Sequence, residues 1–275
     1  MQTRNRVTIF ITLITLTFII FSSSTSLAKY ITFESKVEAV STVKLPRTHT
    51  IKTTSIEFKD SSEKLFFKKE PSIPVYLTFD DGPTEHTPAI LDILKKYEIK
   101  STFFMLNNNI HKNPDIVKTV SENGHTVGCH GVTHKVKLFY KTNTSPKEEM
   151  VACGKSVEDV IDSKVQVIRV PFGSSPYLTS AQKSELEKSQ FIMWDWNVDS
   201  HDWSMNSSDK IVQTVLQQVK KLKEKEITPV LLFHDKEITV KALPQIIEQL
   251  KKLGYDFKPI TVDDTPLQFS IKKQS

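Results

Sequence analysis

The chain lacks the features that would place it in several specialised classes of protein. Its 275 residues include only two cysteines, too few for a disulfide-stapled scaffold. Its N-terminal apolar stretch, residues 7–21, is short for a membrane-spanning helix, which needs about 20 apolar residues. The net charge of +5 is small and the lysines are scattered over amphipathic segments, so nucleic-acid binding is not indicated. The remaining composition is that of a globular protein, long enough for one sizeable α/β domain or two small ones.

The first 28 residues have the pattern of an export signal. Arg4 and Arg6 precede the apolar stretch, and Ser26-Leu27-Ala28 resembles a cleavage site before Lys29. We favour a cleaved signal peptide over an uncleaved N-terminal membrane anchor. The absence of cysteine from this segment argues against a lipoprotein anchor. Loss of its two arginines lowers the net charge from +5 to +3, and mild basicity suits an anionic surface such as a cell wall.

The two cysteines are Cys129 and Cys153. Export permits a disulfide, but we expect a buried, unbridged pair. Cys129 adjoins His130, and neighbouring side chains at a strand end point to opposite sides. We therefore exclude Cys129 as a metal ligand.

Residues 29–70 are polar and predict a linker or stalk, and residues 71–275 predict the folded domain. Strands are predicted at 75–80, 101–106, 125–129, 166–169, 191–194, 229–233 and 256–260. Helices are predicted from 87, at 113–124, at 145–161 with a capping box formed by Ser145 and Glu148, at 179–188, from 206 or 207, and at 240–253. This alternation predicts parallel strands, wound as an open sheet or closed as a barrel. Reactive groups then gather at the carboxyl ends of the strands.

Polar residues follow several of these predicted strands. The segments are Asp80-Asp81-Gly82-Pro83, His130-Gly131-Val132-Thr133-His134, Arg169-Val170-Pro171-Phe172-Gly173, Asp199-Ser200-His201-Asp202-Trp203 and His234-Asp235. A histidine pair alone is common and would not establish a metal site. Two imidazoles, one carboxylate and an open position make a catalytic zinc site, which activates water and polarises a carbonyl. A second carboxylate and a further histidine would supply base and acid, and the combination describes amide hydrolysis.

The ordered segments TFDDGP, HGVTH, RVPFG, DSHDW and LLFHD resemble the five motifs of the polysaccharide deacetylase family, the NodB-homology domain of carbohydrate esterase family 4. The resemblance covers about residues 71–260. It implies a distorted, incomplete (β/α) barrel of about seven parallel strands. It also implies a hydrolase that removes N-acetyl, or sometimes O-acetyl, groups from polysaccharides.

The resemblance assigns roles to individual residues. Among the charged groups these are Asp80 as general base, Asp81, His130 and His134 as metal ligands, Arg169 as partner of the base, His234 as general acid and Asp202 as the carboxylate that tunes it. Among the apolar groups, Trp203 and Leu231 would line the acetyl pocket. Phe172 would contact substrate, and a backbone N–H near it would stabilise the oxyanion.

The chain departs from the family pattern at two of these motifs. Gly131 stands where the family usually has Ser or Thr, and loss of that hydroxyl would loosen a ligand histidine. Phe172 stands where Tyr is frequent. Three other residues receive ordinary explanations: a solvent-facing position for His201, a core position for Trp194 and a bond to a helix start for Asp235.

The sequence therefore predicts a monomeric, secreted or wall-associated deacetylase whose metal is zinc, with cobalt or nickel as alternatives. Peptidoglycan N-acetylglucosamine is the favoured substrate. N-acetylmuramic acid, chitin oligomers and acetylxylan remain open, as does an inactive wall-binding domain on the same scaffold. An uncleaved leader would tether the protein to the membrane.

Overall fold

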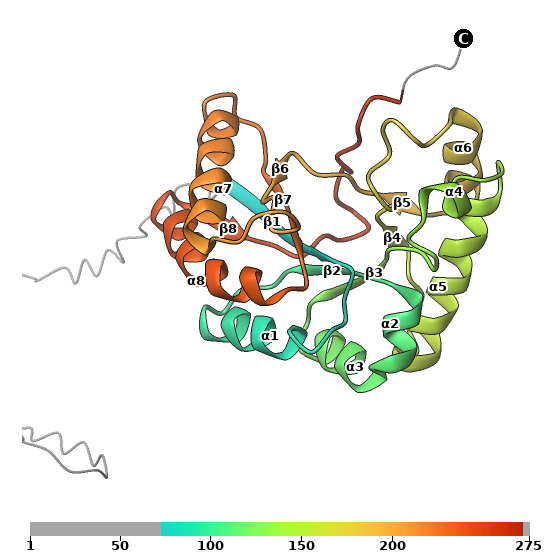
Figure 1. Ribbon diagram of the computed structural model, residues 1–275, viewed down its shortest axis with the longest axis horizontal. Coiled ribbons are helices and arrows are strands. Elements are labelled where there is room, and N and C mark those ends of the chain that lie inside the picture. Colours follow the sequence, from blue (N-terminus) through green and yellow to red (C-terminus); the bar gives the residue numbers. More distant parts are fainter. Residues whose placement is uncertain (1–72, 272–275) are drawn as a thin grey trace, which may run out of the picture. The chain divides into compact units, whose positions relative to one another are not determined.

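The structure, a computed structural model, describes residues 73–271, and Figure 1 shows the arrangement of its elements. The predicted leader and the predicted linker at 29–70 lie outside the described residues. The strands are β1 Ile73–Asp80, β2 Thr102–Met105, β3 Thr126–Cys129, β4 Val167–Ile168, β5 Ile192–Met193, β6 Val198–Asp199, β7 Val230–His234 and β8 Tyr255–Phe257. All the predicted strands are present, several of them shorter than expected, and β6 is an addition.

Helices connect most of these strands. They are α1 Thr87–Lys96, α2 Asn107–Lys112, α3 Pro114–Glu122, α4 Val136–Phe139, α5 Ser145–Ile161, α6 Ser180–Lys188, α7 Ser208–Lys223 and α8 Glu237–Lys252. The short helices α2 and α4 were not predicted. None of the helices in the described part of the chain has the length and apolarity that crossing a bilayer requires.

Every strand pairing is parallel, and the row runs β5-β4-β3-β2-β1-β7-β6, with β8 pairing with β1 in addition. The two ends of this row, β5 and β6, are separated by only four residues of chain. The row must therefore curl until its ends approach each other without pairing. Asp195, in that short connection, donates its N–H to Leu267 O and accepts from Phe269 N, so the C-terminal segment fills the gap. The predicted incomplete barrel is confirmed.

Strand alternation separates the two faces of this curled sheet. Leu77 and Phe79 of β1 pack with Leu231 and Phe233 of β7 in the main core, which the apolar faces of the surrounding helices complete. Asp80, next along β1, belongs to the opposite face.

Helix α7 is an example of a helix that covers this core. Its buried residues Ile211, Val215 and Val219 recur at a spacing of four residues, and Ser207 caps the helix by accepting a hydrogen bond from Lys210 N.

The prediction of an unbridged cysteine pair is wrong. Cys129, the last residue of β3, and Cys153 of α5 form a disulfide, with their Cα atoms 5.9 Å apart. That separation is within the range a disulfide spans. The two residues meet because α5 packs across the end of β3 (Figure 1), a contact that sequence spacing does not reveal.

Candidate active site

Four strands bring polar residues to one edge of the barrel. The register of β1 against β7 places Asp80 beside His234, and Arg169 follows β4, donating its backbone N–H to Cys129 O of β3. His130 directly follows β3. Because the strands are parallel, their carboxyl ends share this edge, as the sequence predicts.

Asp81, His130 and His134 form a compact set of metal-ligand atoms. One oxygen or nitrogen from each lies within 4.8 Å of the others. Asp81 Oδ1 is 3.7 Å from His130 Nε2 and 3.5 Å from His134 Nε2. This oxygen is buried, yet no residue of 73–271 donates a hydrogen bond to it. A buried carboxylate oxygen without a donor is costly unless a cation occupies the space before it, so the residues present fit a divalent metal.

Neighbouring groups prepare the three side chains for this role. Nδ1 of His130 lies 2.7 Å from Arg169 O, which fixes the proton on Nδ1 and leaves Nε2 free to bind a metal. Burial, followed by the charge of His130, lowers the pKa of His134 and so favours the neutral ring that a metal requires. Asn109 Nδ2 donates to Asp81 O at 2.7 Å and holds that residue at a φ of 71°.

Asp80 lies beside this set without belonging to it. Its Oδ1 accepts a hydrogen bond from Arg169 Nη1 at 3.0 Å, and its Oδ2 lies 3.7 Å from His130 Nε2. Arg169 is fully buried; it also donates to Thr78 Oγ1 and to two backbone carbonyls, and its guanidinium lies over the ring of Phe104. One oxygen of Asp80 is therefore fixed by a cation, and the other faces the candidate metal position.

His234 stands at the end of β7 with Asp202 behind it. Asp202 Oδ1 is 2.7 Å from His234 Nδ1, and Asp202 Oδ2 accepts from His234 N at 2.7 Å and from Thr239 Oγ1 at 2.5 Å. Burial on its own lowers the pKa of His234, but the bond to Asp202 and the charges of Asp202, Asp80 and Asp81 outweigh it, and the net shift is upward. The ring is held as a proton donor whose Nε2 is directed away from Asp202.

Two aromatic side chains from the predicted set are exposed. Phe172 is 46% exposed and its ring centroid lies 4.6 Å from that of His134. Trp203 is 55% exposed, and its ring lies 5.9 Å from His201. Exposed aromatic faces are suited to contact a sugar ring.

The placement of Leu231 at the acetyl pocket is wrong. Its side chain is fully buried in the core with Phe79 and Phe233, on the face opposite Asp80 and His234. Leu232, two residues before His234, lies on the face of the site because side chains alternate along a strand.

Comparison with known proteins identifies the family of this chain. A profile of the polysaccharide deacetylase family matches residues 67–190. YheN of Bacillus subtilis, which carries the name of a polysaccharide deacetylase, is 40% identical over 222 residues, covering 74% of this chain and 78% of its own. The chain belongs to the polysaccharide deacetylase family. Another relative, a peptidoglycan-N-acetylglucosamine deacetylase of Bacillus cereus, is 34% identical over 210 residues and is matched over 74% of each chain.

A solved structure of the polysaccharide deacetylase family has the same fold. The crystal structure of the polysaccharide deacetylase Bc1974 from Bacillus cereus is 34% identical, with a TM-score of 0.67, over 72% of this chain and 97% of that one. The incomplete barrel is thus a fold shared with this family.

Sequence reasoning missed several residues that support this deacetylase site. Thr78 and Thr239 each hydrogen-bond a charged group of the site, and Glu149 of α5 binds the loop between the two histidines. Thr78 carried a usable signal, since it precedes Asp80 by two residues and so shares its strand face. Asp235 bonds Thr84 and Thr87 at the start of α1, as expected.

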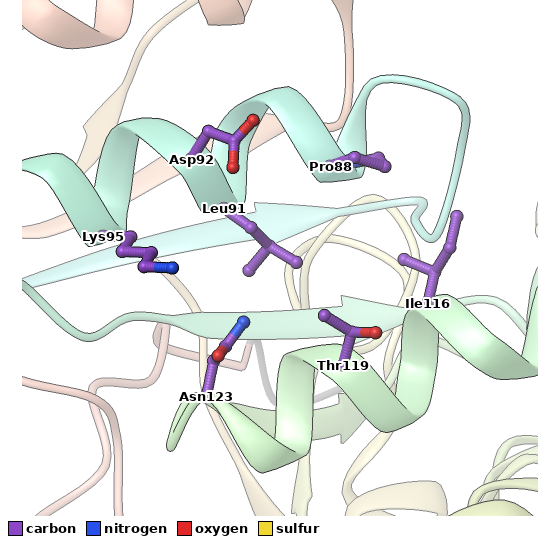
Figure 2. Close-up of a pocket in the computed structure, with 7 residues that line it drawn as sticks. All are labelled: Pro88, Leu91, Asp92, Lys95, Ile116, Thr119 and Asn123. Carbon is purple, nitrogen blue, oxygen red and sulfur yellow. The ribbon is translucent and has the colours of Figure 1, made fainter.

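A separate groove of about 400 Å³ lies between α1 and α3 and is shown in Figure 2. It contains no histidine, no cysteine and only one carboxylate, that of Asp92, so it offers no group of residues for metal or acid–base chemistry. It is lined by Pro88, Leu91, Asp92, Lys95, Ile116, Thr119 and Asn123.

Proposed function

We propose that this protein is a metal-dependent deacetylase that removes the N-acetyl group from N-acetylglucosamine of peptidoglycan. The observation that carries the proposal is the position of Asp80 between Arg169 and the Asp81, His130 and His134 set, with His234 at the neighbouring strand end. The peptidoglycan-N-acetylglucosamine deacetylase of Bacillus cereus, similar over most of its length, favours this substrate over other acetylated sugars.

The residues divide the proton transfers of amide hydrolysis between them. A divalent metal bound by Asp81, His130 and His134 would act as a Lewis acid toward the acetyl carbonyl and make water more acidic. Asp80 accepts a proton from the attacking water through Oδ2, while Arg169 holds Oδ1. The water oxygen forms a bond to the acetyl carbon, and the bond from that carbon to the sugar nitrogen breaks.

His234 completes the reaction by donating its proton to the leaving sugar nitrogen, so the products are acetate and a free amine on the sugar. Asp202 stabilises the charged ring before donation. A backbone N–H near Phe172 stabilises the oxyanion. Phe172 contacts the sugar. Trp203 lines the acetyl pocket together with Leu232, which takes the place of Leu231.

The metal is zinc in this proposal. Two imidazoles and one carboxylate form the donor set typical of catalytic zinc, and cobalt or nickel binds the same donors. Metal analysis of protein purified without added metal, followed by acetate release after reconstitution with each ion, tests this assignment.

The protein acts outside the membrane in this proposal, as a monomer. Residues 1–28 direct export, 29–70 form a linker and 71–275 form the catalytic domain. Mass spectrometry of the mature N-terminus tests cleavage before Lys29, and an intact leader in the membrane fraction would indicate a tether instead.

The substrate is tested by measuring acetate release from peptidoglycan, chitin oligomers and acetylxylan with the metal-loaded protein. Release from peptidoglycan alone, with N-acetylglucosamine as the residue that loses its acetyl group, is the expected result. Loss from N-acetylmuramic acid, or preference for the other polymers, would reassign the substrate. Absence of release from every polymer would favour an inactive wall-binding domain.

A further inference from the structure

The loop between the two ligand histidines is held by a carboxylate from outside the family motifs. Residues 131–134 belong to no helix or strand. Glu149 of α5 accepts hydrogen bonds from Val132 N and Thr133 N, both at 2.9 Å, through Oε2, and from Thr133 Oγ1 at 2.7 Å through Oε1. Hydrogen bonds to a charged acceptor are about twice as strong as neutral ones. The two residues that immediately precede His134 are thus both bound to one side chain.

The same helix also fixes the other side of His130. Cys153 lies one turn beyond Glu149 on α5, at i+4, and is joined by the disulfide to Cys129. Residues four apart share a helix face. The segment from Cys129 to Thr133, which includes His130, is therefore attached to one face of α5 at both ends.

Gly131 shows why a carboxylate from α5 takes this position. Its φ is +94°, and a Cβ placed on it would lie 2.9 Å from a ring carbon of Phe139 and 3.3 Å from Glu149 Oε2. The space that the side chain of a Ser or Thr would occupy is filled by these two residues. Glu149 therefore reaches the loop through space that a side chain at residue 131 would need.

We propose that Glu149 is a positioning residue for the metal site, fixing His134 through the backbone of Val132 and Thr133. This inference rests on the proposed function only in requiring that Asp81, His130 and His134 bind a divalent metal. Without Glu149, three donors of the loop lose their acceptor, the loop relaxes, and His134 no longer meets Asp81 at the 3.5 Å separation found here. Groups that orient metal ligands typically change metal affinity by 10–100-fold.

The test compares three variants of the full chain: Glu149→Ala, Glu149→Gln and the control Glu148→Ala. Glu148 is the neighbouring glutamate on α5 and is exposed, so its removal reports any general effect of losing a charge from this helix. Zn²⁺ affinity is measured by competition with a chromogenic chelator. The Co²⁺ absorption spectrum reports ligand geometry, and the thermal midpoint of the metal-free protein reports stability.

Glu149→Ala should lower Zn²⁺ affinity about 10-fold or more and change the Co²⁺ spectrum. Glu149→Gln should lose less, about threefold, because the amide oxygen still accepts the two backbone N–H groups without the charge. Glu148→Ala should match the wild type. Affinity within twofold of the control for Glu149→Ala would overturn the proposal. A lower thermal midpoint with unchanged affinity and spectrum would also overturn it, because the role would then be structural alone.

Should Glu149→Ala fail to fold, the Gln variant decides: Zn²⁺ affinity equal to that of the control overturns the proposal, and a loss with an altered Co²⁺ spectrum supports it. These measurements contain no glycan. A wild-type protein that binds Zn²⁺ but releases no acetate from any polymer would therefore contradict the proposed function and leave the role of Glu149 to be decided by its own test.

Discussion

Asp202 binds His234 twice, once at the ring nitrogen Nδ1 and once at the backbone N–H, each at 2.7 Å. The pair of bonds fixes both the position of the residue and the orientation of its ring. Burial alone lowers the pKa of this histidine, and the carboxylate reverses that effect, so the pKa is raised. A raised pKa keeps the ring protonated as an acid must be.

The first prediction concerns pH. Deacetylation should fall as the pH rises through the pKa of His234, because the ring then loses the proton it donates. Asp202→Asn removes the group that raises this pKa most, while the opposing effect of burial remains. The alkaline limb of kcat/KM should therefore move to lower pH, and the maximal rate should fall about 10²-fold or more. An unshifted alkaline limb would contradict the role of Asp202. Asp199→Asn, which alters a carboxylate bonded to His201 N, serves as control.

The same pair contributes to stability with a defined sign. Since the pKa of folded His234 is raised, its contribution is complete below the unfolded value of about 6.5 and is lost as the pH rises through the folded value. Urea unfolding across this range should show that loss in the wild type and not in Asp202→Asn.

The second prediction concerns the metal. A chelator should abolish acetate release, and added Zn²⁺ should restore it. Asp81→Asn removes the only carboxylate of the ligand set and should weaken Zn²⁺ binding by at least about 10-fold. Asp92→Asn, an exposed carboxylate on α1, should bind Zn²⁺ like the wild type. Full activity in the presence of excess chelator, with no metal left in the protein, would contradict the proposed mechanism.

The third prediction concerns Gly131. Restoring a hydroxyl with Gly131→Ser should reduce activity and stability, because a side chain there meets Phe139 and Glu149 at a positive φ. The left-handed backbone alone costs about 1–2 kcal/mol. Gly154→Ala, where an added Cβ meets nothing within 4 Å, should instead stabilise α5 by up to about 1 kcal/mol. Higher activity in Gly131→Ser would show that the missing hydroxyl, and not the available space, limits the site.

The fourth prediction concerns the disulfide. Its partners are 24 residues apart, so reduction should lower the free energy of unfolding by about 3 kcal/mol, measured by urea denaturation with and without reductant. Cys153→Ser should unfold at the same urea concentration in both conditions. Wild-type protein that is unfolded without reductant should have no free thiols. Two free thiols per chain would contradict the disulfide.

The parallel barrel and the residues at its strand ends could be predicted because both depend on local patterns. Strands and helices alternate with clear periodicity, and the residues after each strand must share one edge of a parallel sheet. Asp80 and His234 could be expected near each other without knowing their register. The apolar residue on the face of the site could also be predicted. Side chains two residues apart on a strand share a face, so the residue that shares the face of His234 is Leu232 and not Leu231.

Contacts made by α5 could not be predicted, because they depend on how this helix packs across β3. Neither the bond from Glu149 to residues 132–133 nor the Cys129–Cys153 bridge follows from spacing. At the start of α5, Ser145 does not form the capping box expected with Glu148. The Oγ of Ser145 instead accepts a hydrogen bond from Thr142 N. A complete capping box is found at α6, between Thr179 and Gln182.

The most direct test of the account measures acetate released from purified peptidoglycan by the Zn²⁺-loaded wild type and by Asp80→Asn. Asn retains an acceptor for Arg169 but cannot take a proton, so the variant should bind Zn²⁺ like the wild type while its rate falls about 10²–10⁴-fold. Zn²⁺-loaded Asp80→Asn that releases acetate at the wild-type rate would contradict the assignment of Asp80 as the base, and with it the proposed mechanism.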